Sequence, residues 1–202
     1  GIYSYGFEEP SPIQGKSILP ITSGKDIIAQ AQSGTGKTGA FSISMLQRID
    51  ENKKEPQGLI MAPTRELALQ IHKVVENLGR FLNISCKLLI GGNSIDQNIS
   101  DLESMPHILI GTPGRVHDLI RRKKLNSKTI KMLVLDEADD MLSTGFKDQI
   151  YSIFQHLSND IQIVLFSATL PNDILQLTSK FMRDPINILV KKDSVTLEGI
   201  KQ

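Results

Sequence analysis

A glycine-rich segment near the start of the chain has the composition of a phosphate-binding loop. It follows a short apolar run at residues 26–29 and precedes a stretch in which apolar residues, among them Phe41 and Leu46, have helical spacing. Glycines let backbone N–H groups curl around phosphate oxygens, lysine reaches the outer phosphates, and a threonine hydroxyl can ligate Mg²⁺. A surface turn before an ordinary helix is the alternative, which the preceding strand disfavours. The expected nucleotide-binding residues here are Ser33, Gly34, Thr35, Gly36, Lys37 and Thr38.

Two adjacent carboxylates, Asp136 and Glu137, emerge directly from the apolar run at residues 132–135. Asp136 can hold Mg²⁺ opposite Thr38, largely through water, and Glu137 can polarise a water for in-line attack on a terminal phosphate. The alternative is a solvated acidic turn that caps the next helix. Because a phosphate loop is also present, we expect Lys37, Asp136 and Glu137 to be catalytic, with Thr38 and Asp136 as the metal ligands.

The spacing of apolar residues predicts an α/β fold that would bring these segments together. Short apolar runs alternate with longer stretches, such as residues 65–81, in which apolar residues recur every three or four positions. This alternation implies a predominantly parallel sheet with helices on both faces, and ligands of such sheets gather beyond the carboxyl ends of the strands. The expected strands are residues 26–29, 58–62, 87–90, 107–110, 132–135 and 163–166.

Further motifs follow these strand ends, and together they resemble the DEAD-box RNA helicases over nearly the whole chain. Residues 136–139 read Asp-Glu-Ala-Asp, and the other matching segments are Gly6-Phe7 to Pro10 with Ile13-Gln14, residues 63–68, Gly91-Gly92, residues 112–115 and residues 167–169. The resemblance implies a RecA-like P-loop NTPase domain over residues 1–190. Residues 191–202 would begin a linker to a second RecA-like domain. Residues 145–151 and 196–202 resemble the translation initiation helicase 4A subfamily and its exon-junction paralogue.

The resemblance also implies a role for each motif, although Gln14, Arg65 and Arg115 taken singly would be read as ordinary helix-start residues. The amide of Gln14 would read adenine, since an amide pairs with adenine N6 and N7 but mismatches guanine O6. RNA would be held by its backbone, without an aromatic platform, so binding should be sequence-independent and salt-sensitive. The expected RNA-binding residues are Pro63, Thr64, Arg65, Gly92, Thr112, Pro113, Gly114 and Arg115, and the residues expected to couple the two sites are Asp139, Ser167 and Thr169.

Composition permits a nucleic-acid partner only at a local surface, because 23 Lys and Arg against 22 Asp and Glu give the 202-residue chain a formal charge of +1. The basic run at 121–124 is better explained as a helix end than as an RNA contact.

The single cysteine, Cys86, lies in an apolar run, which favours an intracellular protein. No run approaches the roughly 20 apolar residues of a membrane span, so no membrane partner is expected. Both chain ends suggest a segment of a longer protein.

We therefore expect the N-terminal domain of an ATP-dependent RNA helicase, an RNA-stimulated ATPase that uses ATP and Mg²⁺ on single-stranded or short duplex RNA. It would act in translation initiation by unwinding mRNA, with initiation-factor scaffolds as partners, in the cytoplasm. The isolated domain should be nearly inactive, since the family supplies an arginine finger from the second domain. An ATP-dependent RNA clamp and scaffold of the exon-junction type, acting in nuclear mRNA processing, is the alternative. A P-loop kinase or transporter ATPase is disfavoured, because neither needs the Gln14 motif together with residues 112–115.

Overall fold

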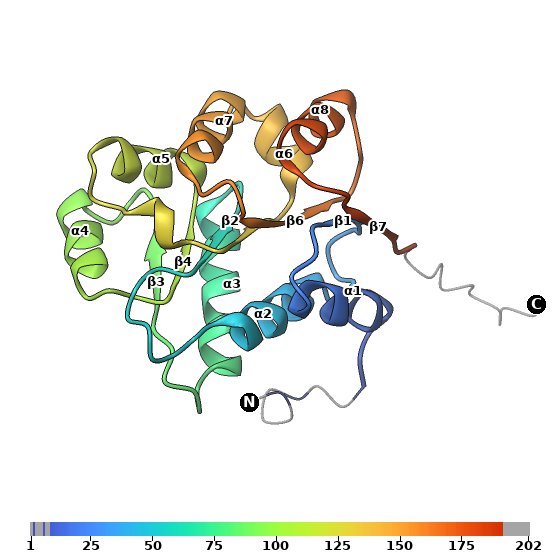
Figure 1. Cartoon of the computed structure of the whole chain (residues 1–202), viewed down its shortest axis with the longest axis horizontal. Coiled ribbons are helices and arrows are strands. Elements are labelled where there is room, and N and C mark those ends of the chain that lie inside the picture. The colour runs from blue at the N-terminus through green and yellow to red at the C-terminus, as the bar shows by residue number, and fades with distance from the viewer. Residues whose placement is uncertain (1, 3–5, 7–8, 192–202) are drawn as a thin grey trace, which may run out of the picture.

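Seven strands form one sheet in the computed structural model, which describes residues 2, 6 and 9–191 (Figure 1). The strands are β1 (Ile27–Gln30), β2 (Gly58–Met61), β3 (Cys86–Leu89), β4 (Ile108–Gly111), β5 (Met132–Leu135), β6 (Gln162–Ser167) and β7 (Ile186–Leu189). Their order is β3-β4-β2-β5-β6-β1-β7, and every neighbouring pair is parallel. The carboxyl ends of all these strands therefore meet along one edge of the sheet. Phe7 of the expected adenine motif, and the expected linker beyond Lys191, lie outside the described residues.

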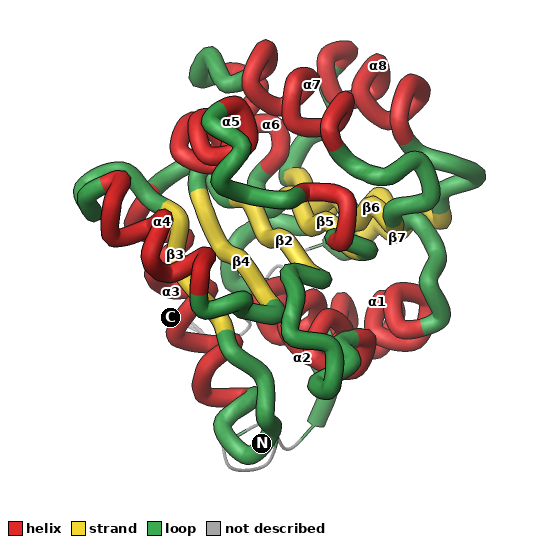
Figure 2. The backbone as a smooth tube through the Cα atoms, turned by 60° about the vertical axis from the view of Figure 1, so that its left-hand side comes forward, coloured by secondary structure: helices red, strands yellow, loops and turns green. Residues whose placement is uncertain are grey.

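Helices cover both faces of the sheet, as the side-on tube in Figure 2 shows. Helices α1 to α3 pack on one face around the apolar cluster that includes Phe41 and Phe166, and α4 to α8 pack on the other around Leu133 and Met141. The expected α/β class with helices on both faces is thus confirmed. The helices are α1 (Pro12–Thr22), α2 (Lys37–Arg48), α3 (Arg65–Leu78), α4 (Ile95–Glu103), α5 (Pro113–Arg121), α6 (Ala138–Ser143), α7 (Lys147–His156) and α8 (Asn172–Phe181), with a short 3₁₀ helix, η2 (Ser127–Thr129).

The expected strands agree with the structure to within one residue at each end, and β7 was missed. Strands β2, β4 and β5 are buried along their whole length, which is why they stand out as unbroken apolar runs. Strand β7 lies at the edge of the sheet and only one of its four residues is buried. Its residues, Ile186-Asn187-Ile188-Leu189, are mostly apolar, so the sequence does contain a strand signal here, although most of the strand is exposed in the fold.

The helix expected at residues 65–81 is wrong at its end. Helix α3 begins at Arg65, where the hydroxyl of Thr64 accepts a hydrogen bond from the N–H of Leu67 and caps the first turn. It ends at Leu78, and the N–H of Gly79 closes the last turn on the carbonyl of Val75. Glycine commonly stands where a helix stops.

Among the described residues, no helix combines the length and the apolar character needed to cross a bilayer.

Candidate active site and adjoining cleft

The glycine-rich loop connects β1 to α2 at the carboxyl edge of the sheet, as the sequence predicts. Gly34 and Gly36 have φ values of +82° and +89°, a left-handed backbone region that residues with a side chain rarely adopt. Gly36 is the N-cap of α2 and Lys37 is its first residue, so the loop residues precede the positive end of the helix dipole. The loop therefore offers N–H groups and a lysine to one anionic ligand.

Lys37 reaches across the sheet edge to both carboxylates that follow β5. Its Nζ lies 2.8 Å from Asp136 Oδ1 and 3.6 Å from Glu137 Oε1. Asp136 is fully buried, and burial raises the pKa of its carboxyl despite the opposing effect of Lys37. Asp136 Oδ1 also accepts a hydrogen bond from the N–H of Glu137, whereas Oδ2 has no partner among the described residues. Asp136 thus retains one buried oxygen that could receive a further ligand.

Glu137 has an unusual backbone for a residue with a long side chain. Its φ and ψ are 49° and 52°, the left-handed region, at the N-cap of α6. Such a conformation costs on the order of 1–3 kcal/mol and is commonest at functional sites. Partial burial raises the pKa of its carboxyl, Lys37 opposes that shift, and the negative charge of Asp136 adds to it. The result is a partly exposed carboxylate that is a stronger base than an ordinary glutamate.

Gln14 joins α1 to the glycine-rich loop. Its Nε2 donates to the carbonyl of Gly36 at 3.2 Å, and its Oε1 accepts from the N–H of Ser11 at 2.9 Å. Ser11 is the N-cap of α1, so the two residues form a capping box that also contacts the loop. The amide is 5% exposed, and each polar atom retains capacity for one more hydrogen bond. The sequence did not single out Ser11, which the fold places so close to Gly36 that a Cβ on this glycine would lie 2.5 Å from the Ser11 hydroxyl oxygen.

Asp139, Ser167 and Thr169, the residues expected to couple the two sites, do form one network. Asp139 Oδ2 accepts hydrogen bonds from the N–H and the hydroxyl of Thr169, at 3.1 and 2.8 Å. The hydroxyl of Ser167 accepts from the N–H of Asp139 at 3.2 Å and donates to the carbonyl of Thr169 at 2.6 Å. These contacts tie the start of α6 to the loop that follows β6.

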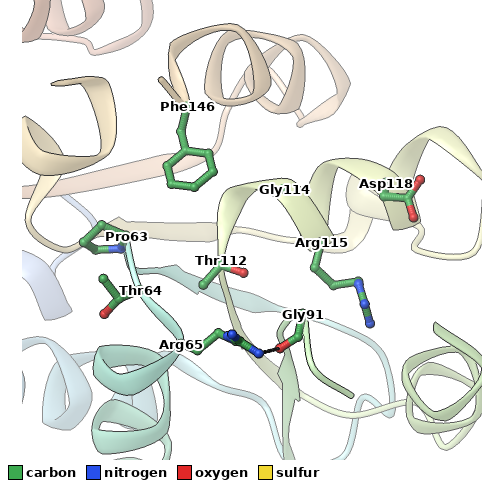
Figure 3. Close-up of a pocket in the computed structure, with 9 residues that line it drawn as sticks. All are labelled: Pro63, Thr64, Arg65, Gly91, Thr112, Gly114, Arg115, Asp118 and Phe146. Atoms are coloured by element: carbon green, nitrogen blue, oxygen red, sulfur yellow. Dashed lines mark hydrogen bonds between the residues drawn. The ribbon is translucent and has the colours of Figure 1, made fainter. Parts of the chain in front are cut away.

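A cleft of about 620 Å³ opens beyond the ends of β2 and β4 (Figure 3). Helices α3 and α5 begin at its wall, so the positive ends of two helix dipoles lie beside it. Six of the eight expected RNA-binding residues line it, whereas Pro113 is buried and Gly92 is an exposed residue beside the Arg65 guanidinium. The lining residues are Pro63, Thr64, Arg65, Gly91, Thr112, Gly114, Arg115, Asp118 and Phe146.

Contacts around Arg65 and the side chain of Phe146 shape the cleft. Arg65 Nη1 donates to the carbonyl of Gly91 at 3.1 Å, the dashed contact in Figure 3. Gly92 has a φ of +99°, and a Cβ on it would collide with the Arg65 guanidinium, so only glycine suits that position. Phe146, which precedes α7, points into the cleft. The sequence motifs contain no aromatic platform among the arginines, and Phe146 adds an aromatic side chain to the cleft from outside those motifs.

The order of these segments along the chain matches a known family over most of its length. The family model described as "DEAD/DEAH box helicase" matches residues 11–177. The chain belongs to the DEAD/DEAH box helicase family. The helicase motifs expected from the sequence therefore lie on a domain of that family, with the RecA-like fold.

Curated relatives are similar in sequence to the whole of this chain. It is 60% identical to an ATP-dependent RNA helicase eIF4A of Pyricularia oryzae, over 100% of this chain and 51% of that protein. It is 59% identical to the ATP-dependent RNA helicase FAL1 of Mycosarcoma maydis, also over 100% of this chain and 51% of that protein. The chain thus spans about half the length of the curated relatives it matches.

Solved structures of the family superpose closely on the domain. A DEAD box protein from the hyperthermophile Methanococcus jannaschii has a TM-score of 0.89 at 39% identity, covering 94% of this chain and 52% of that one. Dbp5 of Saccharomyces cerevisiae, bound to Nup159, Gle1, IP6 and ADP, has a TM-score of 0.82 at 37% identity, covering 95% of this chain and 51% of that one.

Proposed function

We propose that the protein containing this domain is an ATP-dependent RNA helicase, whose hydrolysis of ATP is stimulated by RNA. One observation carries the proposal: a chain of hydrogen bonds runs along the carboxyl edge from the glycine-rich loop to the cleft. Its backbone links are Ala31 N to Ser167 O at 3.0 Å, Asp136 N to Met61 O at 3.0 Å, Ala62 N to Gly111 O at 3.0 Å and Thr112 N to Leu89 O at 3.2 Å. The contact of Asp139 with Ser167 completes it. Ligands at the two ends would therefore bind to the same hydrogen-bonded edge of the sheet.

ATP would bind in the glycine-rich loop, with Lys37 at its outer phosphates. To do so, the Nζ of Lys37 must exchange some of its contact with Asp136 for phosphate oxygens. The side-chain amide of Gln14 would form its remaining hydrogen bonds with adenine. Because the same amide donates to the carbonyl of Gly36, it would connect the bound base to the phosphate loop. Glu137 would orient the attacking water and accept its proton, because its raised pKa favours that role.

The residues present fit a bound Mg²⁺ ion. Asp136 Oδ2 is buried and has no partner in the part of the chain that the structure describes, and Thr38 supplies a hydroxyl in the first turn of α2. Oxygen ligands of this kind, with water between them and the ion, are typical of magnesium sites beside phosphates. When bound, the ion would neutralise phosphate charge. Thr38 and Asp136 are therefore the residues we propose to hold it.

The cleft would hold RNA through its sugar-phosphate backbone. Arg65 and Arg115 supply two guanidinium groups, and the starts of α3 and α5 supply N–H donors and positive dipole ends. Neither arginine forms an ion pair within the described part of the chain, so each retains its charge for an anion. Single-stranded RNA, or a short duplex from which one strand is taken, suits such a surface. Binding should weaken with salt and depend little on sequence.

A second RecA-like domain would complete the enzyme, since the relatives are about twice as long as this chain. In-line phosphoryl transfer needs positive charge at the departing phosphate, which an arginine finger from that domain would supply. Residues 1–202 alone should therefore bind nucleotide weakly and hydrolyse it slowly. Several relatives of this chain are named eIF4A, which supports a cytoplasmic role in translation initiation, with scaffold proteins as partners, over the exon-junction clamp.

Turnover of ATP by the full-length protein tests the proposal, measured with and without single-stranded RNA of arbitrary sequence. We expect RNA to raise turnover at least several-fold. Glu137→Gln removes the base at nearly constant volume and should abolish turnover while RNA binding in the presence of ATP persists. If RNA leaves turnover unchanged, the chain is a nucleotide-binding domain and the RNA assignment fails.

A further inference from the structure

A buried asparagine holds one of the two arginines of the cleft. Asn98 lies on α4 and is 0% exposed. Its Oδ1 accepts a hydrogen bond from Arg115 Nη1 at 2.7 Å, and its Nδ2 donates to the carbonyl of Leu88 at 3.0 Å. Leu88 belongs to β3, the last strand of the sheet on that side. Asn98 therefore connects the sheet margin to a side chain in the cleft.

The two contacts of Arg115 Nη1 leave the rest of its guanidinium group available. Nη1 donates to Asn98 Oδ1 and to the carbonyl of Asn93 at 3.0 Å, which uses both of its N–H groups. Nε and Nη2 have no partner among the described residues. These two nitrogens form one edge of the planar fork, and such an edge matches two oxygens of a phosphate. Because Nη1 is anchored, the Nε–Nη2 edge of Arg115 is the one that remains for a ligand in the cleft.

The partner that holds Arg115 is uncharged. An aspartate at position 98 could also accept from Nη1, but its charge would neutralise the guanidinium and lower its attraction for an anion. Within the described residues, Arg115 forms no ion pair. The amide of Asn98 therefore restrains the side chain while its charge remains available.

We propose that Asn98 is a positioning residue for RNA, which fixes Arg115 so that its Nε–Nη2 edge meets one backbone phosphate. The inference rests on the proposed function of the cleft and assigns its ligand chemistry there: a single phosphodiester, held bidentately. A purely structural role for Asn98 would instead require only that its amide satisfy the carbonyl of Leu88 and fill space under α4.

A double-mutant cycle on the full-length protein separates these roles. RNA affinity is measured by fluorescence anisotropy with a labelled single strand and a non-hydrolysable ATP analogue, for Asn98→Ala, Arg115→Ala and the double variant. We expect each single variant to weaken RNA binding by about tenfold or more, the size of one charge-assisted contact. The double variant should be no weaker than Arg115→Ala, because Asn98 acts through that residue.

Two further readouts distinguish positioning from general destabilisation. In the RNA-stimulated ATPase assay, Asn98→Ala should raise the KM for RNA and leave the KM for ATP unchanged. Asn98→Asp, which keeps the side-chain volume and serves if Asn98→Ala does not fold, should lower the slope of log affinity against log salt by about 0.7, the loss of one phosphate contact to a single strand. Asn83→Ala, an exposed asparagine outside the cleft, is the matched control and should change neither quantity.

Additive effects in the double variant would overturn the proposal, as would a KM for ATP that rises together with that for RNA. An unchanged salt slope in Asn98→Asp would overturn it as well. If Arg115→Ala itself leaves RNA affinity unaltered, the assignment of RNA to the cleft fails and this inference falls with it. Those results are separable, because the additive outcome requires Arg115→Ala to weaken binding.

Discussion

Alanine in place of Gly36 should destabilise the domain more than alanine in place of Gly34. Both glycines have left-handed φ values, +89° and +82°, so each substitution carries a similar backbone cost of about 1–2 kcal/mol. A Cβ on Gly36 would lie 2.5 Å from Ser11 Oγ and 3.0 Å from Gln14 Nε2, whereas a Cβ on Gly34 meets no atom within 4 Å. Overpacking of that kind adds about 1–3 kcal/mol. The free energy of unfolding should thus fall by about 1–2 kcal/mol for Gly34→Ala and by about 2–5 kcal/mol for Gly36→Ala.

Chemical denaturation of the 202-residue chain without nucleotide measures both losses by linear extrapolation. Gly34→Ala is the matched control, since it shares the backbone cost and lacks the collision. Adding Ser11→Ala to Gly36→Ala removes the nearest colliding atom, so the double variant should lose less stability than the sum of its parts. Equal losses for the two glycine variants, or strict additivity with Ser11→Ala, would refute the packing of α1 against the loop as the reason for glycine at position 36.

Three other predictions concern the sites themselves. Since burial raises the pKa of Glu137 above 4.5, kcat of the full-length protein with RNA should fall as the pH drops through that raised value and level off above it; a profile that is flat down to pH 4.5 contradicts this. Lys37→Met leaves the buried Asp136 unpaired and should cost about 3–5 kcal/mol of unfolding free energy, part of which Asp136→Asn restores in the same denaturation assay. Gly92→Ala should weaken RNA binding about tenfold by displacing Arg65, and anisotropy should show no further loss when Arg65→Ala is already present.

The sequence predicts most of the parallel sheet and the segments at its carboxyl edge. Strands such as β2 and β5 are buried on both faces, so their apolar runs follow directly from the fold. The glycine-rich loop is also a local feature, because its glycines, its lysine and the helix after it are contiguous. Strand β7 was not predicted although its residues are mostly apolar, and its edge position and exposure became apparent only in the folded sheet.

The sequence alone establishes the motifs and their position at the carboxyl ends of the strands, whereas their order along the sheet edge comes from the strand order of the fold. The tertiary structure is needed to show how residues distant in sequence complete each site: Ser11 lies beside Gly36, Phe146 lines the cleft, and Asn98 accepts a hydrogen bond from Arg115. None of these is marked by periodicity or by a local motif, because each depends on packing between elements well separated in the chain. The raised pKa of Asp136 also depends on the tertiary structure, because only the folded chain removes water from this carboxylate.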